Sequence, residues 1–126
     1  MTVSEAIRKA EAILPGHAAP EGEEDARWQA IIAVGEFVQT DPEEVCAFSE
    51  KWGQHADADL RMAIATCLLE HLLEYHFESV FERVAKCART NKNFADTLSS
   101  CWKFGKVLEP RNAARFDKLV NETHRA

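Results

Sequence analysis

Residues 57–88 read DADLRMAIATCLLEHLLEYHFESVFERVAKCA and predict two consecutive α-helices that fold against each other. In the first helix, apolar residues recur at i, i+4, i+7, i+8 and i+12, which places them on one helical face. They are Leu60, Ile64, Cys67, Leu68 and Leu72. A second apolar face consists of Met62, Ala65, Leu69 and Leu73. A helix with two apolar faces needs neighbours on both sides, so we expect it at the centre of the molecule.

The turn between these two helices contains no Gly or Pro, and we place it near Tyr75 and His76, where the apolar register changes. The second helix then directs one apolar face inward, formed by Phe77, Val80, Phe81, Val84 and Ala88. The alternative is one continuous helix over residues 59–89. Uncapped helices of that length are typical of coiled coils rather than of small domains.

Five further helices flank the central pair. A helix over residues 3–14 ends at Pro15-Gly16, and the Pro- and Gly-containing residues 15–24 predict a loop. Apolar periodicity then predicts a helix from residue 25 to 38, and Asp41-Pro42 starts another that ends near Gly53. Beyond a polar break at 89–93 we expect helices over 93–104, with Gly105 as a left-handed C-terminal residue, and over 110–122. No segment alternates as a half-buried strand would, so the prediction is one all-α domain over residues 1–126.

The predicted helices repeat at a fixed spacing. Asp25, Asp59 and Asn93 mark the first helices of three pairs, and successive positions are 34 residues apart. The pairs are hairpins over about 25–53, 57–89 and 93–122. A helix–turn–helix unit repeated at such a period is typical of an α-solenoid, in which each hairpin buries its apolar face against the next.

The first helices resemble those of HEAT-like repeats, in which an Asp is followed by an aliphatic residue, an Arg, and then small and aliphatic positions. The residues that carry the resemblance are Asp57, Leu60, Arg61, Ile64, Ala65 and Leu68, with a looser copy in Asp25, Arg27, Ala30, Ile31 and Val34. In the third copy Asn93 and Ala95 replace the Asp and the Arg. The resemblance implies a short right-handed superhelix, a structural ladder that includes Asp57, Asp59 and Arg61, and a binding scaffold rather than an enzyme.

Composition narrows the class of protein further. The 126 residues carry a net charge of −6, which disfavours general nucleic-acid binding. The charge is uneven, because residues 1–60 hold 13 acids and 4 bases (net −9) whereas residues 61–126 hold 8 acids and 11 bases (net +3). No apolar run is long enough to span a bilayer, and the N-terminus lacks the pattern of a signal peptide. The four cysteines form no C-x-x-C pair, and we expect reduced thiols in a cytoplasmic protein.

The leading functional hypothesis is a non-enzymatic, cofactor-free scaffold or adaptor that binds another protein. Stacked second helices would present carboxylates to a basic partner, as in an acidic inhibitor or immunity-type protein that masks a basic nuclease or toxin. The residues of this predicted surface are Glu43, Glu44, Glu50, Glu78 and Glu82, together with Trp52. Of the three tryptophans, Trp52 is expected to be the most exposed because it lies at a helix end; core packing is expected for at least two of them.

Two alternatives belong to other classes. The first is a metal-binding protein or an enzyme that uses the cluster Glu70, His71, Glu74 and His76. The spacing of this cluster is neither H-E-x-x-H nor the Glu-x-x-His of di-iron bundles. Cys67 lies one turn from His71, which allows a thiol–imidazole contact. Nucleic-acid binding would use the basic C-terminal residues Lys103, Lys106, Arg111, Arg115 and Lys118, which the acidic N-terminal half opposes.

Overall fold

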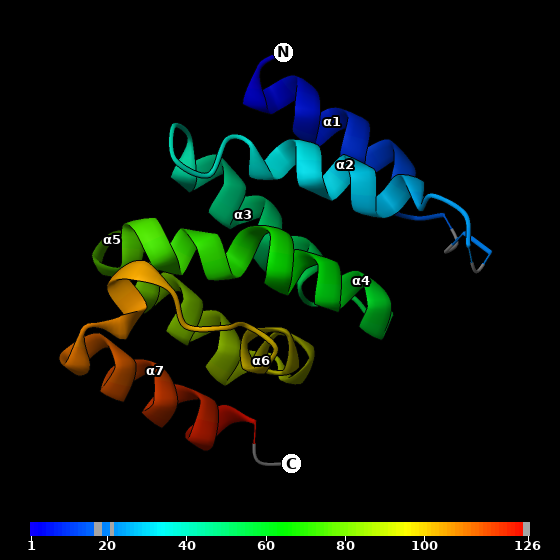
Figure 1. The fold of residues 1–126 in the computed structure, drawn as a ribbon. Helices are drawn as coiled ribbons and strands as arrows, with labels where there is room; N and C mark the ends of the chain where they lie inside the picture. The colour runs from blue at the N-terminus through cyan, green and yellow to red at the C-terminus, as the bar shows by residue number, and fades with distance from the viewer. Residues whose placement is uncertain (17–18, 21, 125–126) are drawn as a thin grey trace.

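A computed structural model describes residues 1–16, 19–20 and 22–124, and the regular structure of these residues is helical throughout (Figure 1). The prediction of an all-α fold is therefore confirmed. The elements are α1 (Val3–Ile13), α2 (Ala26–Gly35), α3 (Pro42–Trp52), α4 (Ala58–Ile64), the π-helical turn η1 (Ala65–Leu69), α5 (Glu70–Thr90), α6 (Lys92–Ser99), the 3₁₀ turn η2 (Gly105–Leu108) and α7 (Pro110–Thr123). Residues 17, 18 and 21 of the predicted loop 15–24 lie outside the described residues. In the described part of the chain, no helix has the length and apolar character needed to cross a membrane.

Helix α5 consists of two parts that meet at His76. The backbone of His76 is non-helical, with φ −130° and ψ 32°, and the chain turns back on itself there (Figure 1). The imidazole Nε2 of His76 lies 3.0 Å from the carbonyl oxygen of Val38, in the connection between α2 and α3. The turn predicted near Tyr75 and His76 is correct, and the alternative of one continuous helix over 59–89 is wrong.

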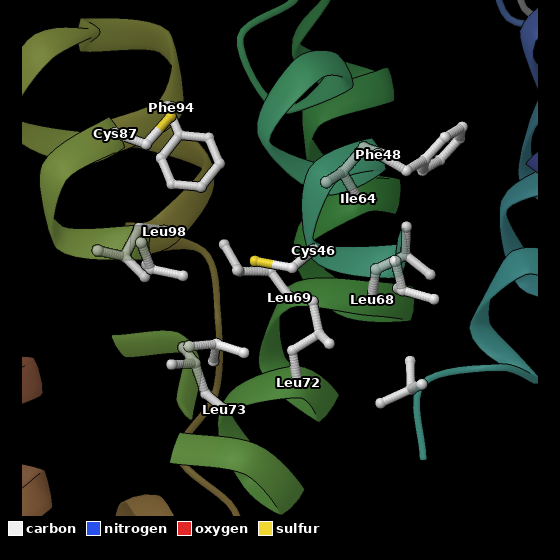
Figure 2. Packing of buried hydrophobic residues seen from close by; sticks show 14 of the residues in the cluster. Cys46, Phe48, Ile64, Leu68, Leu69, Leu72, Leu73, Cys87, Phe94 and Leu98 are labelled. Carbon is white, nitrogen blue, oxygen red and sulfur yellow. The ribbon is translucent and has the colours of Figure 1, made fainter. Parts of the chain in front are cut away.

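The helices pack in two layers with α1 along one side. The first layer contains α2, the run from α4 through η1 to residue 75 of α5, and α6; the second contains α3, residues 77–90 of α5, and α7 (Figure 1). Helix α1 covers α2 and also touches α3. Figure 2 shows side chains of α3, η1 and α6 meeting in one core, among them Cys46, Leu69 and Leu98. Leu68, Leu69 and Leu72 are 0% exposed, as expected of a central helix with neighbours on both sides.

Ion pairs link successive helices of the first layer. The guanidinium of Arg27 on α2 is almost fully buried and lies 2.9 Å from a carboxylate oxygen of Asp57 and 3.3 Å from one of Asp59. Arg61 on α4 repeats the arrangement with Asp96 on α6, at 2.9 Å. The Arg27 guanidinium holds the pKa of Asp57 below its usual range, and Arg61 does the same for Asp96.

The C-terminal end of α2 packs closely against the π-helical turn η1. A Cβ built on Gly35 would be 3.0 Å from the carbonyl oxygen of Cys67, which is tighter than almost all real contacts. Glycine therefore permits the end of α2 to approach η1. The thiol of Cys101 lies 3.6 Å from the carbonyl oxygen of Ala65, so it can donate a weak hydrogen bond to the same turn. The apolar pattern of residues 57–75 predicts a regular helix there and does not reveal this π-helical turn.

The end of α6 differs from the prediction. The helix stops at Ser99 rather than near residue 104, and the backbone is extended at Phe104 (φ −133°, ψ 159°). Gly105 does take a left-handed conformation, with φ +51°, but it begins η2 instead of following a helix. Residues 101–104 thus form an irregular connection rather than a continuation of the helix, which places their side chains differently.

Candidate protein-interaction surface

The carboxylates predicted to face a partner are largely engaged within the chain. The Glu50 carboxylate of α3 lies 2.6 Å from the guanidinium of Arg83 on α5. Arg115 on α7 approaches Glu78 at 3.6 Å and Glu82 at 3.1 Å. Glu43 and Glu44, in the first turn of α3, are exposed. Three of the five predicted carboxylates are thus paired with an arginine of the next second-layer helix, which lowers the free negative charge of that surface.

The exposed tryptophan is Trp102 and not Trp52. Trp52 is half-buried, packs against Phe48 and donates its indole N–H to Glu11 at 3.3 Å. The Trp28 indole N–H donates to Asp59 at 3.0 Å. Trp102, by contrast, is 72% exposed. The expectation for Trp52 is therefore wrong, because an acceptor on α1 draws its ring inward, whereas α6 ends before Trp102 can turn toward the core.

Exposed large apolar side chains are confined to part of the molecule. Within the described residues, none lies on α3, on residues 77–90 of α5, or on α7. Apart from those of α1 and the N-terminus, they are Ile32, Met62, Tyr75, Trp102, Phe104 and Leu108. Three of the six lie within seven consecutive residues after α6. We call Trp102, Phe104 and Leu108 the apolar segment.

The first part of α5 holds the apolar segment in place. The backbone N–H of Trp102 donates to a carboxylate oxygen of Glu70 at 3.3 Å. The Phe104 ring stacks on the imidazole of His71, with centroids 6.4 Å apart and planes within 10°. Gly105 is pressed against Glu74, since a Cβ at this position would lie 2.7 Å from Glu74 Cγ and 2.9 Å from its carbonyl oxygen.

Contacts with α7 fix the other side of the apolar segment. The Lys103 ammonium lies 2.7 Å from the Asp117 carboxylate, and the Asn112 side-chain amide donates to the carbonyl of Lys106 at 3.0 Å. Val107 is 1% exposed. The Lys103 side chain thus points toward α7, whereas the Phe104 ring packs on His71 of α5. The apolar segment is an ordered feature that presents Trp102 to solvent.

The four residues considered as metal ligands do not converge. Glu70 is 5% exposed and bonded to the Trp102 N–H, and burial raises the pKa of its carboxyl. His71 Nδ1 lies 2.8 Å from a Glu74 carboxylate oxygen, whereas His76 points to the Val38 carbonyl. Across residues 1–16, 19–20 and 22–124, no group of three or more His, Cys, Asp or Glu side chains could hold a metal ion.

The cysteine thiols are not activated. All four are free, and burial raises the pKa of Cys46 to about 12 and that of Cys87 to about 11. Burial likewise raises the pKa of Cys67 and of Cys101. A reactive cysteine needs a thiolate at neutral pH, so the raised pKa of Cys67 opposes the thiol–imidazole alternative.

Part of the basic C-terminal set is engaged within the chain. Lys103 pairs with Asp117, Arg115 with Glu78 and Glu82, and Lys118 lies 3.9 Å from Glu122. The Arg115 guanidinium also lies over the Phe81 ring, 4.6 Å from its centroid. Lys106, Arg111 and Lys118 are exposed, so the pairing reduces but does not remove the cations available to a phosphate backbone.

The fold and this surface define an all-helical domain that presents a preformed, exposed aromatic segment. The chain belongs to a family of unknown function, DUF6869, which matches residues 17–121 and so covers every element except α1 and the end of α7. No curated protein and no solved structure matches the chain.

Proposed function

We propose that this protein is a non-enzymatic protein-binding module and that the apolar segment anchors its partner. The supporting observation is Trp102, which is 72% exposed although Glu70, His71 and Glu74 hold its backbone and its neighbours in place. Tryptophan is the residue type most enriched at the energetic centres of interfaces. A fixed segment also loses little conformational entropy when it binds.

The architecture that we propose is a short right-handed HEAT-like superhelix of three hairpins behind α1. Two observations support it. Arg27 and Arg61, 34 residues apart, each pair with aspartates of the next first-layer helix. In the second layer, Glu50 pairs with Arg83, and Glu82 pairs with Arg115, each across 33 residues. Repeated contacts at a constant separation are typical of stacked hairpins.

We further propose that the partner has a basic surface, as would the target of an acidic inhibitor or immunity-type protein. The net charge of −6 and the exposed Glu43 and Glu44 support this proposal. Glu50, Glu78 and Glu82 pair with arginines of the same chain, so they would contribute less to this attraction, which mainly raises association rate and specificity. Four free cysteines suit a reducing compartment, and a cytoplasmic location is part of the proposal.

Affinity capture from the source cell tests the anchor. Trp102→Ala should weaken capture of the partner by about thirtyfold or more, the effect of a central interface residue worth about 2 kcal/mol. Met62→Ala is the matched control, because Met62 is an exposed apolar residue (43%) on α4, outside the apolar segment. Equal capture by the Trp102→Ala variant and the wild type would refute the anchor. Capture that is unchanged between low and high ionic strength would refute a basic partner.

A further inference from the structure

We propose that a second copy of this chain is one partner of the apolar segment, which packs into the groove between α1 and α2 of that copy. This inference rests on the proposed role of Trp102 as an anchor. Three observations carry it: an apolar groove on the same chain, opposite charge on the two halves of the sequence, and the separate positions of groove and segment in the fold.

The groove has a volume of about 450 Å³ and mostly apolar walls. Ala6 and Ile13 line it from α1, and Ala26, Ala30 and Ala33 from α2. Alanine methyl groups do not reach across the space between two helices, so the groove stays open. Its volume lies within the range of about 300–1,000 Å³ found for ligand pockets. An exposed aromatic ring gains free energy when such apolar walls take it out of water.

The groove and the apolar segment belong to halves of the sequence that carry opposite net charge. Glu24 lines the groove next to Glu23 and Asp25, and residues 1–60 carry a net charge of −9. Lys9 and Met1, which bears the amino terminus, also line the groove, so the negative charge comes from this half of the chain as a whole and not from the lining itself. Lys106 and Arg111 are exposed beside the apolar segment, in the half of the chain with net charge +3. The attraction between the halves favours a head-to-tail approach of two copies.

The groove and the apolar segment lie on different sides of the molecule. Helices α1 and α2 form one end of the stack, and the connection from α6 to η2 lies beyond α5, toward α7 (Figure 1). A chain therefore cannot place its own segment in its own groove. The contact between copies is heterologous and leaves one free groove and one free segment, so further copies can add.

Sedimentation velocity over a concentration series tests this contact with two complementary variants. Trp102→Ala removes the anchor but keeps the groove, whereas Ala33→Arg fills the groove with a charge like that of Lys106 but keeps the anchor. The wild type should show a mass that rises with concentration, and each variant should need about thirtyfold higher concentration to associate. An equimolar mixture of the two variants should form a dimer and nothing larger, because only one intact groove meets one intact segment. Met62→Ala should associate like the wild type.

Several outcomes would overturn the proposal. A wild type that is monomeric at all concentrations refutes the contact between copies. If Trp102→Ala nevertheless loses capture of a cellular partner, the proposed function stands without self-association. A wild type that associates while the variant mixture stays monomeric also refutes the contact, because a different surface must then be used. Circular dichroism verifies the fold of each variant. Ile13→Arg, which fills the groove from α1, replaces Ala33→Arg if that variant unfolds, and it must give the same mixing result.

Discussion

At the scale of single residues, Gly105 fixes the backbone of the apolar segment. Its φ of +51° is left-handed, and a Cβ would meet Glu74 at 2.7 Å. Gly22 is also left-handed, with φ +87°, but has open space around it. Gly22→Ala should therefore cost about 1 kcal/mol of unfolding free energy for the backbone alone. Gly105→Ala should cost about 2 to 3 kcal/mol, because the contact with Glu74 adds to it. Urea unfolding measures both, and equal losses would mean that Glu74 moves aside without cost.

Glu70 is a buried carboxyl whose role is to accept the Trp102 N–H. Burial raises its pKa; the bond from Trp102 and the nearby His71 oppose the rise. In the pH range between the unfolded and the folded pKa, the folded state binds more protons, so this carboxyl lowers stability as pH rises. Glu70→Gln keeps an acceptor without the charge and should be at least as stable as the wild type at pH 7, with a smaller gain on acidification. Glu70→Ala should lose about 1 to 2 kcal/mol, since the N–H is left unpaired.

Urea unfolding at pH 7 and at mildly acidic pH separates these two Glu70 variants. A Glu70→Gln protein that is as unstable as Glu70→Ala would show that the negative charge itself is needed, and the assignment of Glu70 as a simple acceptor would be wrong.

At the scale of elements, the arginine pairs hold the first layer together. Arg27→Gln and Arg61→Gln should each lower the unfolding free energy by about 1 to 3 kcal/mol. This is less than the loss at a fully buried pair, because the Asp partners are 38% to 51% exposed at the side chain. The lowered pKa values of Asp57 and Asp96 add stability at neutral pH that disappears as pH falls through the folded values. Each variant should therefore lose less stability on acidification than the wild type.

The control for the arginine pairs is Lys118→Gln. Lys118 is 78% exposed at the side chain and lies 3.9 Å from Glu122, so its loss should change stability by less than about 0.5 kcal/mol. Urea unfolding at pH 7 and near pH 3 is the measurement. If Arg27→Gln behaved like Lys118→Gln, the contacts between α2 and α4 would not contribute to the stability of the stack.

The helices also show which parts of the structure the sequence could predict and which it could not. Periodicity located the helices and the turn near His76, because burial of an apolar face leaves a regular pattern. It failed after Ser99, where Leu98, Cys101 and Trp102 continue a helical spacing although the helix has ended. The pattern of a single segment does not report that Glu70, 32 residues earlier, accepts the backbone N–H of Trp102. Trp102 therefore could not be recognised as exposed from its own neighbours in sequence.

At the scale of the whole molecule, the same limitation applies to the candidate surface. The residue count gives the N-terminal half a net charge of −9, but the pairing of Glu50 with Arg83 and of Glu82 with Arg115 depends on how the helices stack. An acidic residue can be identified from sequence, whereas its neutralisation by a distant arginine requires the tertiary structure. The predicted partner surface moved from the second layer to the apolar segment for this reason.

Local stability should fall from the centre of the stack toward its two outer helices. The turn η1 and the start of α5 have neighbours on both sides, and Leu68 and Leu72 are 0% exposed. A π-helical turn has poorer hydrogen-bond geometry than an α-helix, which alone would favour fast amide exchange. Burial opposes this, because water reaches these amides only when neighbouring helices separate. We therefore expect native-state hydrogen exchange of residues 68–73 to require global unfolding and to be at least about a hundredfold slower than exchange in the last turn of α7. Equal rates would mean that hydrogen-bond geometry, rather than burial, sets the stability of the central helix.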